Sequence, residues 1–164
     1  MVSTGVDTVV WLLVGIALTF LLSTLVLGIA LLHNIHTGFL AAFRVTMLAI
    51  HLHVAIVGWA LIMMVGVSHR LLPMFLLAHG ADTRWTRRAL ASLAVGVLTL
   101  GIGLAAGNAP LVWGGVTALE AGIVCFVFQA YSFYRVRVRK KIDVGMQFAM
   151  TAIAFLIAAA VMGP

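Results

Sequence analysis

The chain contains very little charge: 9% of its 164 residues are Asp, Glu, Lys or Arg, and 64% belong to the apolar set AVILMFWYC. Soluble globular proteins carry roughly 25% charged and about 45–50% apolar residues, so the composition excludes a soluble domain. It also excludes a disordered chain and a nucleic-acid-binding protein, because both depend on a much larger charged fraction. Cys125 is the single cysteine, which excludes a disulfide framework and a cysteine-based zinc site.

Long stretches without any charge predict membrane-spanning helices, because a helix needs about 20 apolar residues to cross a bilayer. Such stretches cover residues 8–43, 45–69, 89–119 and 144–164. We therefore predict an all-α integral membrane bundle of five transmembrane helices, with residues 1–164 forming one domain. The expected spans are Val9–Leu32, Thr46–Leu72, Ala89–Ala106, Leu111–Tyr134 and Val144–Met162.

The formal net charge of +6 is concentrated in two loops. Apart from Arg44, the Lys and Arg residues form two groups. One lies around the connection between the second and third expected spans and the other between the fourth and fifth: Arg70, Arg84, Arg87 and Arg88, then Arg135, Arg137, Arg139, Lys140 and Lys141. Basic loops favour the cytoplasmic side of a membrane. This predicts a multi-pass protein of the cell inner (cytoplasmic) membrane, with the N-terminus inside and the C-terminus outside.

Among the polar groups within or at the ends of the expected spans, five ionisable side chains stand out as candidates for function. An ionisable group at the bilayer centre costs about 2.5–3.5 kcal/mol even on the gentler insertion scales, so such groups mark functional sites by default. The candidates are His33 and His36 near the end of the first span, His51 and His53 inside the second, and Glu120 inside the fourth.

His51 and His53 cannot bind one metal ion together from a regular helix. Successive residues turn by about 100°, so positions two apart point to nearly opposite faces. Each histidine must therefore serve a different partner. Neutral imidazole is a good ligand for iron, and a haem fits between apolar helices. The alternative is that both histidines only form hydrogen bonds to neighbouring helices.

The segment around this pair resembles the tenth helix of haem-copper oxidase subunit I, the family of cytochrome c oxidases and nitric oxide reductases. The family helix opens with a His-x-His pair and closes with a Gly, a His and a Pro-x-Phe motif. Here the corresponding residues are His51, His53, Gly66, His69, Pro73 and Phe75, with Gly58 between. Gly66, Pro73 and Phe75 keep the family's spacing from His51, while Gly58 and His69 lie one residue nearer.

The resemblance implies a haem ligand role for both histidines. It makes His51 similar to the ligand of the high-spin haem and His53 similar to the ligand of the low-spin haem, with one or two haem b groups per chain. The family helix runs from the outer to the inner face with its histidines nearer the outer side. The charge distribution predicts the same direction, with His51 roughly 9 Å below the outer end of the span.

The resemblance covers residues 51–75 and does not extend to a complete reaction centre. Family members use further histidines on other helices to hold copper or iron, whereas the third, fourth and fifth expected spans contain no histidine. One chain therefore cannot build a haem-copper binuclear centre. Nothing in the residues indicates bound copper, and whether the protein is an enzyme stays open.

Further ligands must be sought elsewhere in the chain. His33 and His36 are candidates for the second axial position at His53, with Met47 and Met64 as weaker alternatives. For Glu120 we weigh a proton relay, a hydrogen bond to a ligating imidazole, a place near the haem edge, and a purely structural hydrogen bond to backbone. We expect the remaining histidines, His69 and His79, to be solvated or to cap helix ends.

Two haem groups on opposite faces of one helix need protein on both sides, so we expect a homo-oligomer or a subunit of a larger membrane complex. Small residues in the third and fourth spans predict close helix contacts: Gly96, Gly101, Gly103, Gly107, Gly114, Gly115, Ala118 and Gly122, with Gly103 and Gly107 in a GxxxG pattern. The partners expected are the lipid bilayer and a redox protein, and no nucleic acid.

Three functions follow from these residues. The first is a haem b protein of the respiratory chain that transfers electrons or binds a diatomic gas (O2, NO or CO) through His51 and His53. The second is a reduced oxidase or nitric-oxide-handling enzyme that works with a partner supplying the missing metal. The third is a helix bundle without haem that stabilises a respiratory complex or passes a metal ion.

Overall fold

A computed structural model describes residues 4–78, 83–138 and 143–162, and all secondary structure in these ranges is helical. The elements follow the order α1 (Thr4–Thr37), a short 3-10 turn η1 (Ala41–Phe43), α2 (Arg44–His53), a π-helical segment η2 (Val54–Leu61), α3 (Ile62–Leu76), α4 (Arg84–Ala106), α5 (Ala109–Arg135) and α6 (Val144–Met162). Because η1, α2, η2 and α3 continue one another, residues 41–76 form a single long helix.

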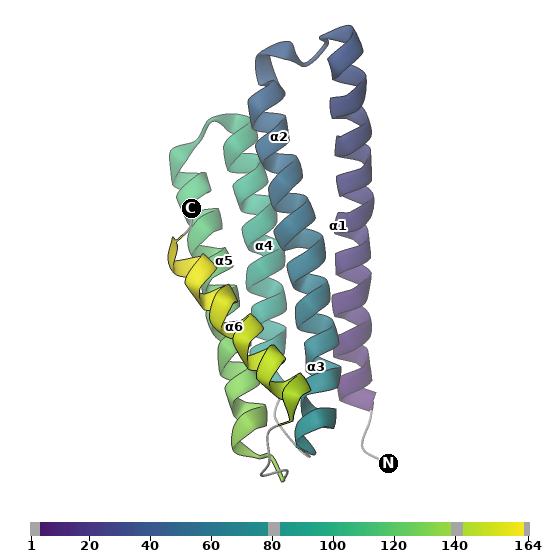
Figure 1. Cartoon of the computed structure of the whole chain (residues 1–164). Coiled ribbons are helices and arrows are strands. Elements are labelled where there is room, and N and C mark those ends of the chain that lie inside the picture. The colour runs from purple at the N-terminus through teal and green to yellow at the C-terminus, as the bar shows by residue number, and fades with distance from the viewer. Residues whose placement is uncertain (1–3, 79–82, 139–142, 163–164) are drawn as a thin grey trace.

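Five of these helices are long and apolar enough to cross a membrane, which confirms the predicted all-α bundle of five spans. Large apolar side chains cover the outside of the bundle, with Trp11 74% exposed, Val45 82% and Val161 82%. Such a surface is stable in contact with lipid and not with water. The start of α1, the end of α3, the start of α4 and the end of α5 lie at one end of the bundle (Figure 1), so both predicted basic loops leave from the same side.

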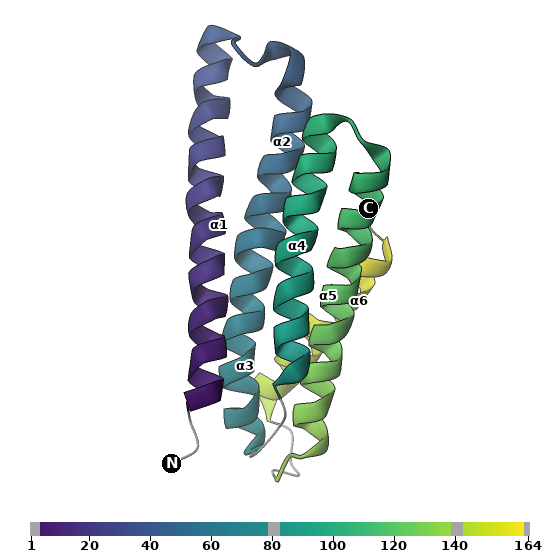
Figure 2. The same ribbon diagram turned by 180° about the vertical axis from the view of Figure 1, so that it is seen from behind.

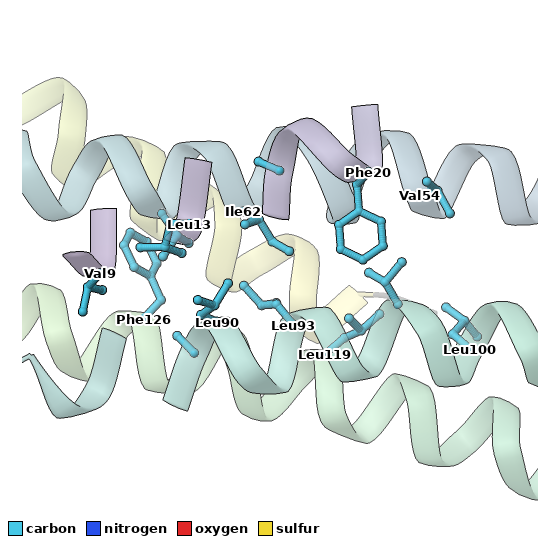
Figure 3. Packing of buried hydrophobic residues seen from close by; sticks show 14 residues of the cluster. Val9, Leu13, Phe20, Val54, Ile62, Leu90, Leu93, Leu100, Leu119 and Phe126 are labelled. Atoms are coloured by element: carbon cyan, nitrogen blue, oxygen red, sulfur yellow. The ribbon is translucent and has the colours of Figure 1, made fainter. Parts of the chain in front are cut away.

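The core lies where α1 packs against the long second helix and α4. Buried residues on α1 recur every three or four positions (Val9, Leu13, Ala17 and Phe20), as expected for one face of a helix. Figure 3 shows Leu13, Phe20, Ile62 and Leu93 converging from these three helices. Two glycines receive the side chains of α1: a Cβ at Gly58 would lie 2.8 Å from Cγ of Phe20, and one at Gly66 would lie 3.0 Å from Cβ of Leu13.

Glycines also bring α4 and α5 together, as the sequence predicts. A Cβ at Gly115 would lie 2.5 Å from the backbone nitrogen of Leu100, and Gly96, Gly103 and Gly122 make similarly close approaches. The predicted GxxxG pair is only half correct. Gly103 packs on α5, but Gly107 has φ +62° and ends α4, a position that glycine occupies without strain.

Helix α6 is the least embedded part of the bundle. It crosses α5 obliquely (Figures 1 and 2), and Met146 is the one buried residue within it. The remainder of α6 leaves apolar cavities between itself and α5. The packing of α6 therefore matters for the candidate site described next.

Candidate functional site

His51 and His53 lie on opposite sides of the second helix, as the angular argument predicts. His51 lines a groove between α1 and α2, whereas His53 lines a groove formed by η2, α4, α5 and α6. Both side chains are half-buried. The helix therefore stands between two separate grooves, each of which receives one imidazole.

The groove at His51 has a volume of about 310 Å³. The imidazole packs against α1 where a glycine leaves room, since a Cβ at Gly28 would lie 3.3 Å from Cε1 of His51. Its Nδ1 atom is buried and has no hydrogen-bond partner. An unsatisfied buried polar atom costs about 1–3 kcal/mol, so it calls for an explanation. The other lining residues are Leu31, Leu32, Ile35, Arg44 and Leu48.

The groove at His53 is larger, about 430 Å³, and almost entirely apolar. Nδ1 of His53 lies 2.8 Å from the backbone oxygen of Ala49. Because a carbonyl oxygen only accepts hydrogen bonds, Nδ1 must carry a proton, and in the neutral imidazole Nε2 then keeps its lone pair for a ligand. Histidines that bind metals characteristically donate their second ring N–H to a carbonyl or carboxylate in this way.

Glu120 on α5 faces the same groove as His53 and also lines a smaller cavity of about 210 Å³ between α5 and α6. The structure therefore brings together two of the polar residues singled out in the sequence, 67 positions apart along the chain. The backbone oxygen of Ala49 already accepts the hydrogen bond from Nδ1 of His53, so Glu120 does not orient the imidazole through that atom. A proton relay and a place near a haem edge stay predictions.

The predicted axial partners of His53 lie elsewhere in this chain. His33 and His36 are exposed in the last two turns of α1, and neither lines a groove. Met64 does line the His53 groove, but it stands on the same helix, roughly 16 Å further along by helical rise. It is too far away to ligate the same iron. Within one chain, each groove therefore offers a single imidazole.

The expectation that His69 is solvated or caps a helix is wrong. His69 is 3% exposed, and its Nδ1 lies 2.8 Å from the hydroxyl of Thr86 on α4. Oε1 of Gln129 on α5 accepts a hydrogen bond from the backbone N–H of Thr86 at 3.1 Å. This network joins α3, α4 and α5 and was missed, although Thr86 and Gln129 are polar residues within or beside apolar spans. His79 lies outside the described residues.

Each groove brings one imidazole to a largely apolar lining. Over residues 4–78, 83–138 and 143–162, no group of three or more His, Cys, Asp or Glu side chains is close enough to hold a metal ion. A haem needs only one or two axial ligands, because the porphyrin supplies four nitrogens. Both groove volumes fall in the range of about 300–1,000 Å³ typical of small-molecule sites.

Comparison with protein-family models, with curated proteins and with solved structures finds no match for this chain. The two grooves and their imidazoles are therefore the features of this chain that bear on function.

Proposed function

We propose that this protein is a membrane-embedded haem-binding protein in which His51 and His53 are axial ligands of haem b, one in each groove. The observation that carries the proposal is the hydrogen bond from Nδ1 of His53 to the backbone oxygen of Ala49, which leaves Nε2 ready to bind iron at an apolar groove. His51 presents the one imidazole of the second groove. The resemblance of residues 51–75 to a haem-binding helix points in the same direction.

The function that fits best is binding of a diatomic gas, with electron transfer as the close alternative. Bound haem would supply one-electron chemistry and an iron able to bind O2, NO or CO. The role of the chain is to hold the iron through one imidazole and to surround it with apolar side chains that keep water away. Because each groove presents a single imidazole, this chain would supply one ligand to each iron, and any further ligand would have to come from a gas or from another chain. An enzymatic function would need metal ligands from such a partner.

We also propose that a second copy of this chain, or another membrane subunit, covers the grooves. Both open at the surface of the bundle, and only part of a bound haem would be enclosed by one chain. The predicted location is the cytoplasmic membrane, where respiratory electron donors are present. A redox protein of the respiratory chain would then be the partner for electron transfer.

The visible spectrum of the purified, haem-replete protein tests this function. We expect a Soret band, and a shift of that band when carbon monoxide is added to the reduced protein. No shift in wild-type protein would mean that both irons are six-coordinate, which favours electron transfer over gas binding. Absence of any Soret band would favour the third function, a helix bundle without haem.

A further inference from the structure

Arg44 shares the apolar groove of His51. Both residues belong to α2, which begins at Arg44. They are seven positions apart, which is two helical turns, so they stand on the same face, separated by roughly 10 Å along the axis. The groove thus combines an imidazole, apolar walls and a guanidinium at its end.

In the part of the chain that the structure describes, no acidic residue stands at the Arg44 end of the bundle. Its four acidic residues are Asp7, Asp82, Glu120 and Asp143. Asp7 and Asp143 belong to the opposite end of the bundle, where α1 and α6 begin (Figure 1). Glu120 lines the other groove, and Asp82 lies outside the described residues. The connections at the Arg44 end, residues 38–43 and 107–108, contain no acid.

We propose that Arg44 binds a propionate carboxylate of a haem ligated by His51. A haem carries two such carboxylates at one edge of an otherwise apolar ring, and arginine binds carboxylates with two parallel hydrogen bonds. The haem propionate would then supply a negative charge that the described residues at the Arg44 end of the bundle do not provide. Arg44 acts as a positioning residue that fixes which edge of the haem faces the membrane surface. The inference rests on the proposed haem function.

A phospholipid headgroup is the competing source of negative charge, since interfacial arginines commonly meet phosphate. A headgroup does not need an imidazole two turns away or a groove between α1 and α2. The shared groove with His51 favours the propionate, because one molecule then pairs with the cation, fills the apolar groove and binds the imidazole.

Binding of ferric haem and of its dimethyl ester, in which both propionates are blocked, tests the proposal. The measurements use His53→Ala protein, so that His51 is the remaining proposed ligand, in maltoside detergent without phospholipid. Titrations are followed by the Soret band. We expect haem to bind on the order of tenfold more tightly than the ester, as a charge-assisted hydrogen bond predicts. Arg44→Gln should lose this preference while keeping its affinity for the ester, and Arg44→Lys should keep part of it.

The matched control is Arg87→Gln, which removes an exposed arginine at the opposite end of the bundle and should keep the full preference. Two results would overturn the propionate contact while leaving the haem function intact. One is equal binding of haem and ester by His53→Ala protein that retains Arg44, and the other is a preference for haem that survives Arg44→Gln. An Arg44→Gln variant that loses affinity for both ligands alike would also overturn it, since Arg44 would then act on the fold. If neither ligand gives a Soret band that depends on His51, the haem function itself fails at this groove.

Discussion

The backbone oxygen of Ala49 and Nδ1 of His53 are 2.8 Å apart, one helical turn from each other. This hydrogen bond fixes the tautomer and the direction of the imidazole without help from any other helix. The π-helical segment Val54–Leu61 begins directly after His53, and such segments are frequent at functional sites. The local backbone around His53 therefore orients the imidazole that we propose as a haem ligand.

The first prediction concerns the space in front of His53. Ala160 on α6 lines the His53 groove, so Ala160→Trp should fill it and weaken haem binding there by roughly tenfold or more, as expected for overpacking. The measurement is a haem titration in a His51→Ala background. Ala158→Trp is the control, because Ala158 is exposed on the same helix and lines neither cavity next to Glu120. Equal effects of the two substitutions would show that bound haem does not occupy this groove.

The second prediction concerns the contact between α4 and α5. Gly115→Ala would place a Cβ 2.5 Å from the backbone nitrogen of Leu100, and because backbone cannot move cheaply we expect a loss of about 2 kcal/mol or more in the free energy of unfolding. The neighbouring Gly114→Ala meets no atom within 4 Å and should leave stability unchanged or slightly higher. Unfolding in mixed detergent and dodecyl sulfate measures both. Similar losses for the two variants would contradict the described helix contact.

The third prediction concerns the network of His69, Thr86 and Gln129. Thr86→Val removes the hydroxyl that pairs with Nδ1 of His69, and we expect a loss of about 1 kcal/mol, in line with hydrogen bonds between membrane helices. Thr151→Val is the control, since that hydroxyl bonds to a carbonyl of its own helix on an exposed face. A double-mutant cycle with His69→Ala should show coupling between the two sites. Additive effects would mean that the two side chains do not interact.

The fourth prediction concerns orientation. In a Cys125→Ala background, Ala106→Cys marks the exposed last residue of α4, next to the connection to α5, and Val138→Cys marks the basic connection after α5. If the basic loops are cytoplasmic, a membrane-impermeant maleimide should label residue 106 in intact cells and residue 138 only after permeabilisation. The reverse pattern would invert the predicted topology.

Much of the fold could be predicted because the bilayer imposes simple rules. Long stretches with little charge, together with the turn residues 107–110, located all five spans, and the angle between positions 51 and 53 placed the two imidazoles on opposite faces. Tertiary packing decides the rest. Nothing in the local pattern shows that His69 is buried against Thr86, because the threonine belongs to the next helix. In the same way, the groove shared by His53 and Glu120 depends on how α6 crosses α5.

The role of Arg44 shows a second limit of the sequence. Its position marks it as the lone basic residue at the end of the bundle opposite the basic loops, which determines topology but says nothing about a ligand. Only the packing of α1 against α2 places it in the same groove as His51. The sequence does place Arg44 and His51 seven residues apart, on one face of the helix. That spacing indicates a shared site only once a groove along this face is known.

The haem content per chain of purified wild-type, His51→Ala, His53→Ala and doubly substituted protein tests the central claim most directly. Pyridine haemochrome absorbance measures the haem, and His33→Ala with His36→Ala serves as the control because neither residue lines a groove. We predict haem in the wild-type and control proteins, less in each single variant, and none in the double variant. Haem retained by the double variant, or no haem in wild-type protein expressed with ample haem, would contradict the account.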